Sequence, residues 1–92
     1  MSVNREVKYA VCELDCVNFD MKIIDVFCDF NCALAFMHGV IDDNETYENS
    51  YYYKKYSDNK NMVSIYKCGY TYGKSLIFRY FIKEYTNTIY YD

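Results

Sequence analysis

The sequence predicts an α+β domain with the element order β-β-α-β-β, in which one helix packs on one face of an antiparallel sheet. Segments that alternate between apolar and polar residues come before and after a single segment with helical apolar spacing. No proline interrupts any of these segments. The chain has 92 residues, of which 52% are hydrophobic, and this suits one folded domain over residues 1–92 and excludes a disordered chain.

The first two strands are expected at residues 5–14 and 21–27. In the first of them, Val11 falls on one face and Cys12 on the other, as alternation along a strand requires. Residues 15–20 are polar and include turn-forming Asn and Asp. Two strands joined by a short polar connection indicate a hairpin.

A helix is expected directly after the hairpin. Asp29 is a good N-cap, because its carboxylate can accept from the free N–H groups of the first turn. The apolar residues that follow recur at three- and four-residue spacing and form one stripe: Phe30, Ala33, Leu34, Met37, Val40 and Ile41. Asp42 and Asp43 end the pattern, and their charges oppose the helix dipole at that end.

A mobile loop is predicted over residues 42–61, where polar residues surround a run of three tyrosines. Twenty residues are long for a loop in a small domain, so a short strand or helical turn at residues 51–56 is the alternative.

The third and fourth strands are expected at residues 62–68 and 74–85, with Gly69 and Gly73 bracketing a second hairpin. Alternation divides the fourth strand into two faces. One face carries Leu76, Phe78, Tyr80 and Ile82, and the other carries Ile77, Arg79, Phe81, Lys83 and Tyr85. Because one helix covers only one side of a sheet, the second face is predicted to be an interface.

Charge and aromatic residues are unevenly distributed along the chain. Residues 1–46 carry nine acidic and three basic side chains, whereas residues 47–92 carry four acidic and seven basic ones. Twelve of the thirteen tyrosines lie in the second half. So many tyrosines exceed what a core of this size encloses, and tyrosine suits an interface because its ring buries area while its hydroxyl keeps a polar tip.

These features predict a non-enzymatic interaction or assembly module that forms a homodimer or contacts another protein. Symmetric dimers are the commonest form of self-association. The predicted interface comprises Tyr66, Arg79, Tyr80, Phe81 and Lys83.

The alternative function is binding of single-stranded nucleic acid through the basic, tyrosine-rich half, residues 47–92. Such proteins combine a cationic track with aromatic side chains on which bases stack. The net charge of −3 and the lack of an RNP-type motif favour the protein-interaction function over this one.

No cofactor is expected. Cys12, Cys16, Cys28 and Cys32 form two C-x3-C pairs whose spacing permits a zinc site. Buried or incidental thiols explain the same residues better, because Cys12 falls in a strand and free cysteine is a common small hydrophobe. The zinc candidates are therefore a secondary hypothesis.

No catalytic constellation is recognised, so no enzymatic activity is expected. The single histidine, His38, lies six residues after Cys32, which places the two on roughly opposite faces of the helix. Asp25 lies within a strand, where an edge position or a basic partner explains it. The segment from Gly69 to Ser75 has three residues between its glycines instead of the four of a P-loop, and a strand pattern follows it.

The N-terminal residues lack the apolar segment of a signal peptide, and no stretch approaches the length of a membrane span. We therefore expect a cytoplasmic protein with no membrane partner, whose five cysteines are reduced thiols.

Two short strings carry a resemblance to a group of known proteins. They are Ile23-Ile24-Asp25-Val26-Phe27 leading to Ala33-Leu34-Ala35-Phe36, and residues 74–85, KSLIFRYFIKEY. With the excess of Tyr, Asn, Ile, Lys and Asp, they resemble small uncharacterised proteins of giant amoebal DNA viruses of the Mimivirus type. The resemblance implies a viral protein found in the host cytoplasm or the virion, and it assigns no activity to any residue.

Overall fold

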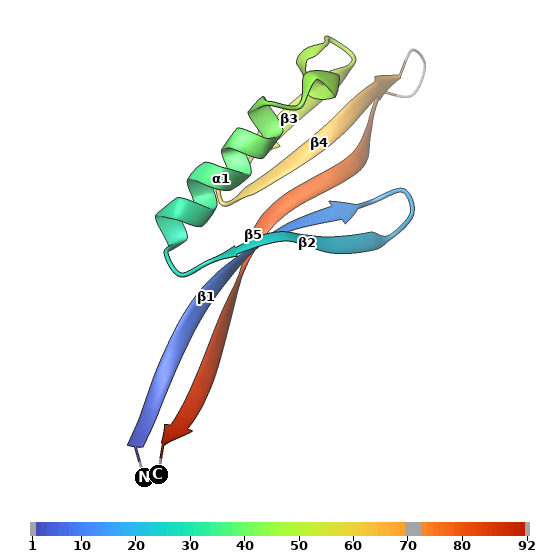
Figure 1. Cartoon of the computed structure of the whole chain (residues 1–92). Coiled ribbons are helices and arrows are strands. Elements are labelled where there is room, and N and C mark those ends of the chain that lie inside the picture. Colours follow the sequence, from blue (N-terminus) through green and yellow to red (C-terminus); the bar gives the residue numbers. More distant parts are fainter. Residues whose placement is uncertain (1, 70–72, 92) are drawn as a thin grey trace.

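The structure, a computed structural model, describes residues 2–69 and 73–91 and consists of an antiparallel sheet with one helix on one face (Figure 1). Its elements are β1 (Ser2–Asp15), β2 (Asp20–Phe27), α1 (Phe30–Asp42), the 3-10 helix η1 (Glu45–Glu48), β3 (Tyr52–Tyr56), β4 (Met62–Gly69) and β5 (Gly73–Tyr91). The five strands lie in the order β2-β1-β5-β4-β3. The predicted α+β class is confirmed.

Helix α1 begins where its cap was predicted. The Asp29 carboxylate accepts from the backbone N–H of Cys32 at 3.1 Å, and the buried positions Ala33, Met37 and Ile41 lie on the predicted apolar stripe. The helix ends at Asp42, and the N–H of its C-cap, Asp43, donates to the carbonyl of Gly39 at 2.9 Å. No helix in the described part of the chain is both long and apolar enough to cross a membrane.

The segment predicted as a mobile loop, residues 42–61, contains two further elements. Asn44 caps η1 by accepting from the N–H of Thr46 at 3.0 Å. Strand β3 pairs with β4 from Tyr52↔Lys67 to Tyr56↔Val63. The sheet therefore has a fifth strand, in the place where the sequence left a short strand open as the alternative to a loop.

The core lies between the helix and one face of the sheet. Val11 of β1, Val63 and Ile65 of β4 and Tyr80 of β5 are buried against the helix residues named above, and Tyr47 of η1 closes one end. Only 1% of the surface of Tyr80 is exposed.

A chain of polar contacts crosses this core through two tyrosine hydroxyls. The Tyr80 hydroxyl donates to the Glu13 carboxylate at 2.8 Å and lies 3.1 Å from the Tyr47 hydroxyl. Lys22 in turn pairs with the Glu13 carboxylate at 3.7 Å. Burial raises the pKa of Tyr80, and its hydrogen bonds to Tyr47 and Glu13 raise it further. The buried hydroxyls are therefore satisfied and neutral, as buried polar groups need to be.

A bulge in β5 changes the alternation that the sequence predicted. Ile65 pairs with Phe78, but Tyr66 pairs with Leu76, so Ile77 is an extra residue and packs against the core. Leu76 consequently lies on the Tyr66 face. The predicted faces of Leu76 and Ile77 are therefore wrong, because one extra residue exchanges the two sides of a strand.

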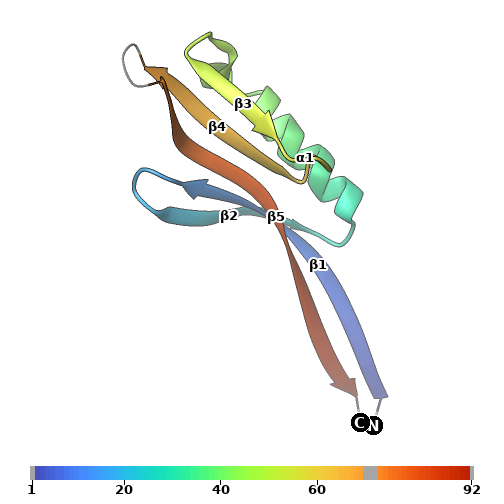
Figure 2. The ribbon, with the colours of Figure 1, turned by 180° about the vertical axis from the view of Figure 1, so that it is seen from behind.

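Strands β1 and β5 run past the rest of the sheet as a two-stranded ribbon (Figures 1 and 2). Their pairing extends from Asp15↔Phe78 to Ser2↔Tyr91. The molecule consequently measures 63 × 23 × 22 Å along its principal axes.

Candidate anion-binding face

The side of the sheet away from α1 is here called the open face. Since partners in antiparallel strands point to the same side, the strand register identifies its side chains. One row across the sheet is Ile23, Cys12, Phe81 and Met62, and the next is Met21, Leu14, Arg79, Ser64 and Lys55. Tyr66 and Tyr53 follow as a pair on the β4–β3 side, and Lys83 lies opposite Ala10.

The open face has two chemically different halves. Over β2 and β1 it is apolar, with Met21, Ile23 and Val26 all about half exposed. Over β5, β4 and β3 it carries cations and aromatic rings. This second half, over β5, β4 and β3, is the candidate site and is called the cationic half.

Positive charge gathers on the open face, and negative charge gathers on the other side. Register places five cations on the open face, Lys8, Lys55, Lys74, Arg79 and Lys83, against one described acid, Glu6, which pairs with Lys8 at 3.5 Å. Between Lys22 and Lys54, by contrast, the chain has six acids and no Lys or Arg, and this segment includes α1 and η1. A chain of net charge −3 thus presents a cationic surface.

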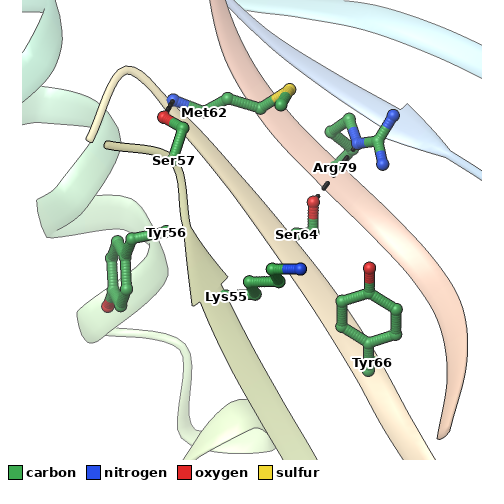
Figure 3. A pocket seen from close by; sticks show the side chains of 7 residues that line it. All are labelled: Lys55, Tyr56, Ser57, Met62, Ser64, Tyr66 and Arg79. Carbon is green, nitrogen blue, oxygen red and sulfur yellow. Dashed lines mark hydrogen bonds between the residues drawn. The ribbon is translucent and has the colours of Figure 1, made fainter. Parts of the chain in front are cut away.

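A shallow hollow of about 150 Å³ lies within the cationic half, across β3, β4 and β5 (Figure 3). Its polar walls are Lys55, Ser57, Ser64 and Arg79, and its other walls are Tyr56, Met62 and Tyr66. The Lys55 ammonium and the Tyr66 hydroxyl extend toward Ser64 in Figure 3.

The hydrogen bonds of the hollow leave its cations available. Nε of Arg79 donates to the Ser64 hydroxyl at 3.3 Å, and this bond holds the guanidinium in place. The salt bridges formed by the described residues involve neither Lys55 nor Arg79. None of the described residues that line the hollow is acidic. An anion entering it would therefore meet two uncompensated positive charges.

Aromatic rings border the hollow on the side of the second hairpin. Tyr53 and Tyr66 pair across β3 and β4, with ring centroids 6.3 Å apart. The ammonium of Lys74 lies 3.6 Å from the centroid of the Tyr53 ring, which is within cation–π range. Rings that are partly exposed beside free cations are the elements of a stacking platform.

Four of the five predicted interface residues lie together on the open face: Tyr66 on β4, and Arg79, Phe81 and Lys83 on β5. Tyr80 lies on the opposite face, in the core, so its side chain is not available to a partner. Alternation had already grouped Tyr80 with Phe78 and Ile82, and that grouping was the signal to leave it out of the interface.

Lys55 lines the hollow but is not among the five predicted interface residues; the sequence placed it only within the basic half, residues 47–92. It belongs to β3, and only the pairing of Lys55 with Ser64 brings it beside Arg79. The sequence shows the charge of Lys55 and the run of three tyrosines before it, but it does not show strand β3 or its register with β4.

The cysteines are free thiols, as predicted, and they are spread over the molecule. Cys12 is buried on β1, where burial raises the pKa of its thiol and nearby Lys83 lowers it by a smaller amount. Cys16 is half-buried, and Cys28 and Cys32 are exposed around the start of α1. Within residues 2–69 and 73–91, no three Cys, His, Asp or Glu side chains are arranged to hold a metal ion.

His38 and Asp25 have local structural explanations. The imidazole of His38 stacks on the Tyr56 ring with 5.6 Å between centroids, and its Nε2 lies 2.9 Å from the carbonyl oxygen of Lys60. Asp25 is exposed on the edge strand β2, where its carboxylate accepts from the N–H of Val26 at 2.7 Å. Neither residue touches the hollow.

The β1–β2 connection is a second exposed feature. Asp15 accepts from the backbone N–H groups of Val17 and Asn18 at 2.9 and 3.0 Å, and the bonds from Asn18 are the main cause of its lowered pKa. Phe19 has a φ of 60° and is 85% exposed.

No family model, curated protein or solved structure matches this chain. The resemblance to giant-virus proteins stays a prediction.

Proposed function

We propose that this protein binds single-stranded nucleic acid on the cationic half of its open face, without catalysing a reaction. One observation carries the proposal. Five cations share the open face with the rings of Tyr53, Tyr66 and Phe81, while the acids of α1, η1 and their flanking residues lie on the side away from it.

Nucleic acid supplies both chemical groups that this face suits. Phosphates pair with lysine and arginine, and unpaired bases stack on aromatic rings. Bases inside a duplex keep their faces covered, so the rings of Tyr53, Tyr66 and Phe81 can stack on unpaired bases of a single strand but not on those inside a duplex. The negative net charge, which favoured a protein partner at the level of composition, does not describe this face.

A homodimer through the same face is the competing proposal. A symmetric contact buries the same patch of both copies against itself, so Arg79, Lys55 and Lys83 would face cations of the second copy. The one described acid that register places on this face, Glu6, already pairs with Lys8. Like charges placed together across an interface cost several kcal/mol. The charge pattern therefore favours an anionic partner over a second copy at this position.

The test is fluorescence anisotropy with a labelled single-stranded 12-nucleotide probe, as DNA and as RNA, over a range of salt concentrations. We expect binding whose logarithm falls linearly with the logarithm of salt, with a slope of about −0.7 for each phosphate neutralised. The double variant Lys55→Gln/Arg79→Gln should weaken binding at least tenfold and reduce that slope by about 1 to 1.5.

Lys67→Gln is the matched control. Lys67 is exposed on β4, but it neighbours Tyr66 in sequence and therefore points to the other side of the sheet. It should leave both affinity and slope unchanged. Absence of binding at low salt, or an equal loss in both variants, would contradict the proposal. Sedimentation that shows a dimer intact in the double variant, with no probe bound, would favour the assembly function.

A further inference from the structure

We infer that the hollow formed by Lys55, Ser64, Tyr66 and Arg79 seats a terminal phosphate monoester, at one end of the bound strand. This inference rests on the proposed function and adds to it the group that is recognised. It follows from the donors in the hollow, their charge and the volume that they enclose.

The donors converge from three strands. Lys55 comes from β3, Ser64 and Tyr66 come from β4, and Arg79 comes from β5 (Figure 3). Ser64 is 6% exposed, so its hydroxyl is held at the base of the hollow. It accepts from Nε of Arg79, which leaves its own proton free to donate and leaves the outer guanidinium nitrogens for a ligand. Phosphate oxygens accept from all of these groups.

The charge of the hollow matches a monoester better than a diester. Lys55 and Arg79 contribute two positive charges, and no described lining residue offsets them. A phosphate monoester carries about −1.5 to −2 at neutral pH, whereas each internal phosphate of a strand carries one charge. A doubly charged end group therefore gains more from this pair of cations than an internal phosphate does.

The size of the hollow limits what enters it. Its volume of about 150 Å³ is below the roughly 300–1,000 Å³ of pockets that enclose whole small molecules. An internal phosphate has a sugar on both sides, while a terminal one can point into a shallow recess. The Tyr53–Tyr66 pair at the rim then lies where the base of the terminal nucleotide can stack.

The experiment compares three probes of one sequence, with a 5′-phosphate, a 3′-phosphate or hydroxyl groups at both ends. We expect one phosphorylated probe to bind at least tenfold more tightly than the hydroxyl-ended probe. Arg79→Lys keeps the charge but loses the forked donor geometry, so it should weaken the phosphorylated probe by a larger factor than the hydroxyl-ended probe and remove most of that preference. Lys83→Gln, outside the hollow, should weaken all three probes equally.

The outcomes separate the two proposals. If all three probes bind with equal affinity, the nucleic-acid function stands and the terminal-phosphate site is overturned. If no probe binds, the nucleic-acid function fails, and a titration with inorganic phosphate followed by NMR decides the site. Saturable shifts at Ser64 and Arg79 that are lost in Arg79→Lys would support a phosphate site independent of nucleic acid, and the absence of shifts would overturn it. Thermal unfolding of each variant verifies that it is folded.

Discussion

The two faces of the sheet are built from the same strands but differ in burial and in charge. On β4, Ile65 is fully buried under the helix, while the next residue, Tyr66, borders an open hollow. On β5, Tyr80 is buried and Arg79 holds a free positive charge beside it. Residues next to each other in a strand therefore lie in different environments, because successive side chains point to opposite faces, one in the core and one on the surface.

Stability and binding should therefore respond to different substitutions in this protein. Substitutions on the covered face should change the free energy of unfolding, and those on the open face should change binding of an anion.

The largest difference is expected between Ile65→Ala and Tyr66→Ala. Removing the buried side chain of Ile65 leaves a cavity and should cost about 2–5 kcal/mol of unfolding free energy. Replacing Tyr66 on the open face should lower the unfolding free energy by less than about 1 kcal/mol and should weaken binding of the nucleic-acid probe. Urea unfolding followed by circular dichroism measures both variants. Equal losses of stability would show that the open face is also part of the core.

Tyr80→Phe should have the next largest effect. It removes the hydroxyl that donates to the Glu13 carboxylate and contacts Tyr47, and a hydrogen bond to a charged group contributes about 1.5–3 kcal/mol. Tyr51→Phe is the matched control, because that ring is half exposed. A loss of stability no larger than that of the control would show that the hydrogen bonds of the Tyr80 hydroxyl do not stabilise the core.

The same variant has a pH signature. The pKa of Tyr80 is raised in the folded protein, so the unfolded chain releases its proton first as pH rises through about 10. The stability from this residue is therefore present below pH 10 and is lost above it. The wild type should lose stability more steeply than Tyr80→Phe between pH 9.5 and 11, measured by urea titration. Parallel curves would contradict this assignment.

The ends of α1 should give a smaller effect, of opposite sign at the two ends. Asp29→Ala removes the N-cap bond to Cys32 and should cost about 1 kcal/mol. Asp43→Asn removes a negative charge from the C-terminal end and should stabilise by about 0.3–1 kcal/mol. Thermal unfolding measures both changes in stability, and neither variant should weaken binding of the nucleic-acid probe. A loss of probe binding in either would mean that the helix side takes part in binding.

The smallest effect is expected at Asp15 in the β1–β2 connection. Bonds from Asn18 lower the pKa of Asp15, so its contribution to stability is present above about pH 4 and is lost as pH falls further. Asp15→Asn should therefore flatten the acid side of the stability curve between pH 5 and 2.5, measured by circular dichroism. An unchanged acid limb would assign acid unfolding to other carboxylates.

Local signals in the sequence predicted most of the fold. Alternation gave the strands, the spacing after Asp29 gave the helix and its cap, and Gly69 and Gly73 gave the second hairpin. The fifth strand was harder to predict, because Tyr52–Tyr56 has polar flanks and is stabilised by pairing with β4. The sequence of β3, YYKKY, has no alternation of apolar and polar residues, so no periodic pattern marks it as a strand.

Only part of the candidate site could be predicted from the sequence, because some of its residues come together through strand pairing. Arg79, Phe81 and Lys83 share a face by simple alternation along one strand, and Tyr66 joins them through the adjacent hairpin strand. Lys55 required a register between β3 and β4. The bulge at Ile77 exchanged two more residues between the faces, and nothing in the apolar pattern there marks an extra residue.

The central position of β5 also affects how the protein folds. Each strand of the β1–β2 hairpin and of the β3–β4–β5 meander finds its partner nearby, but β1 and β5 pair between residues that lie roughly 60 to 90 positions apart in the chain. Contacts of such high sequence separation slow folding, because the loop must close before they form. During synthesis β1 and β4 keep unpaired edges until β5 has left the ribosome, and this interval is when the chain is most exposed to aggregation.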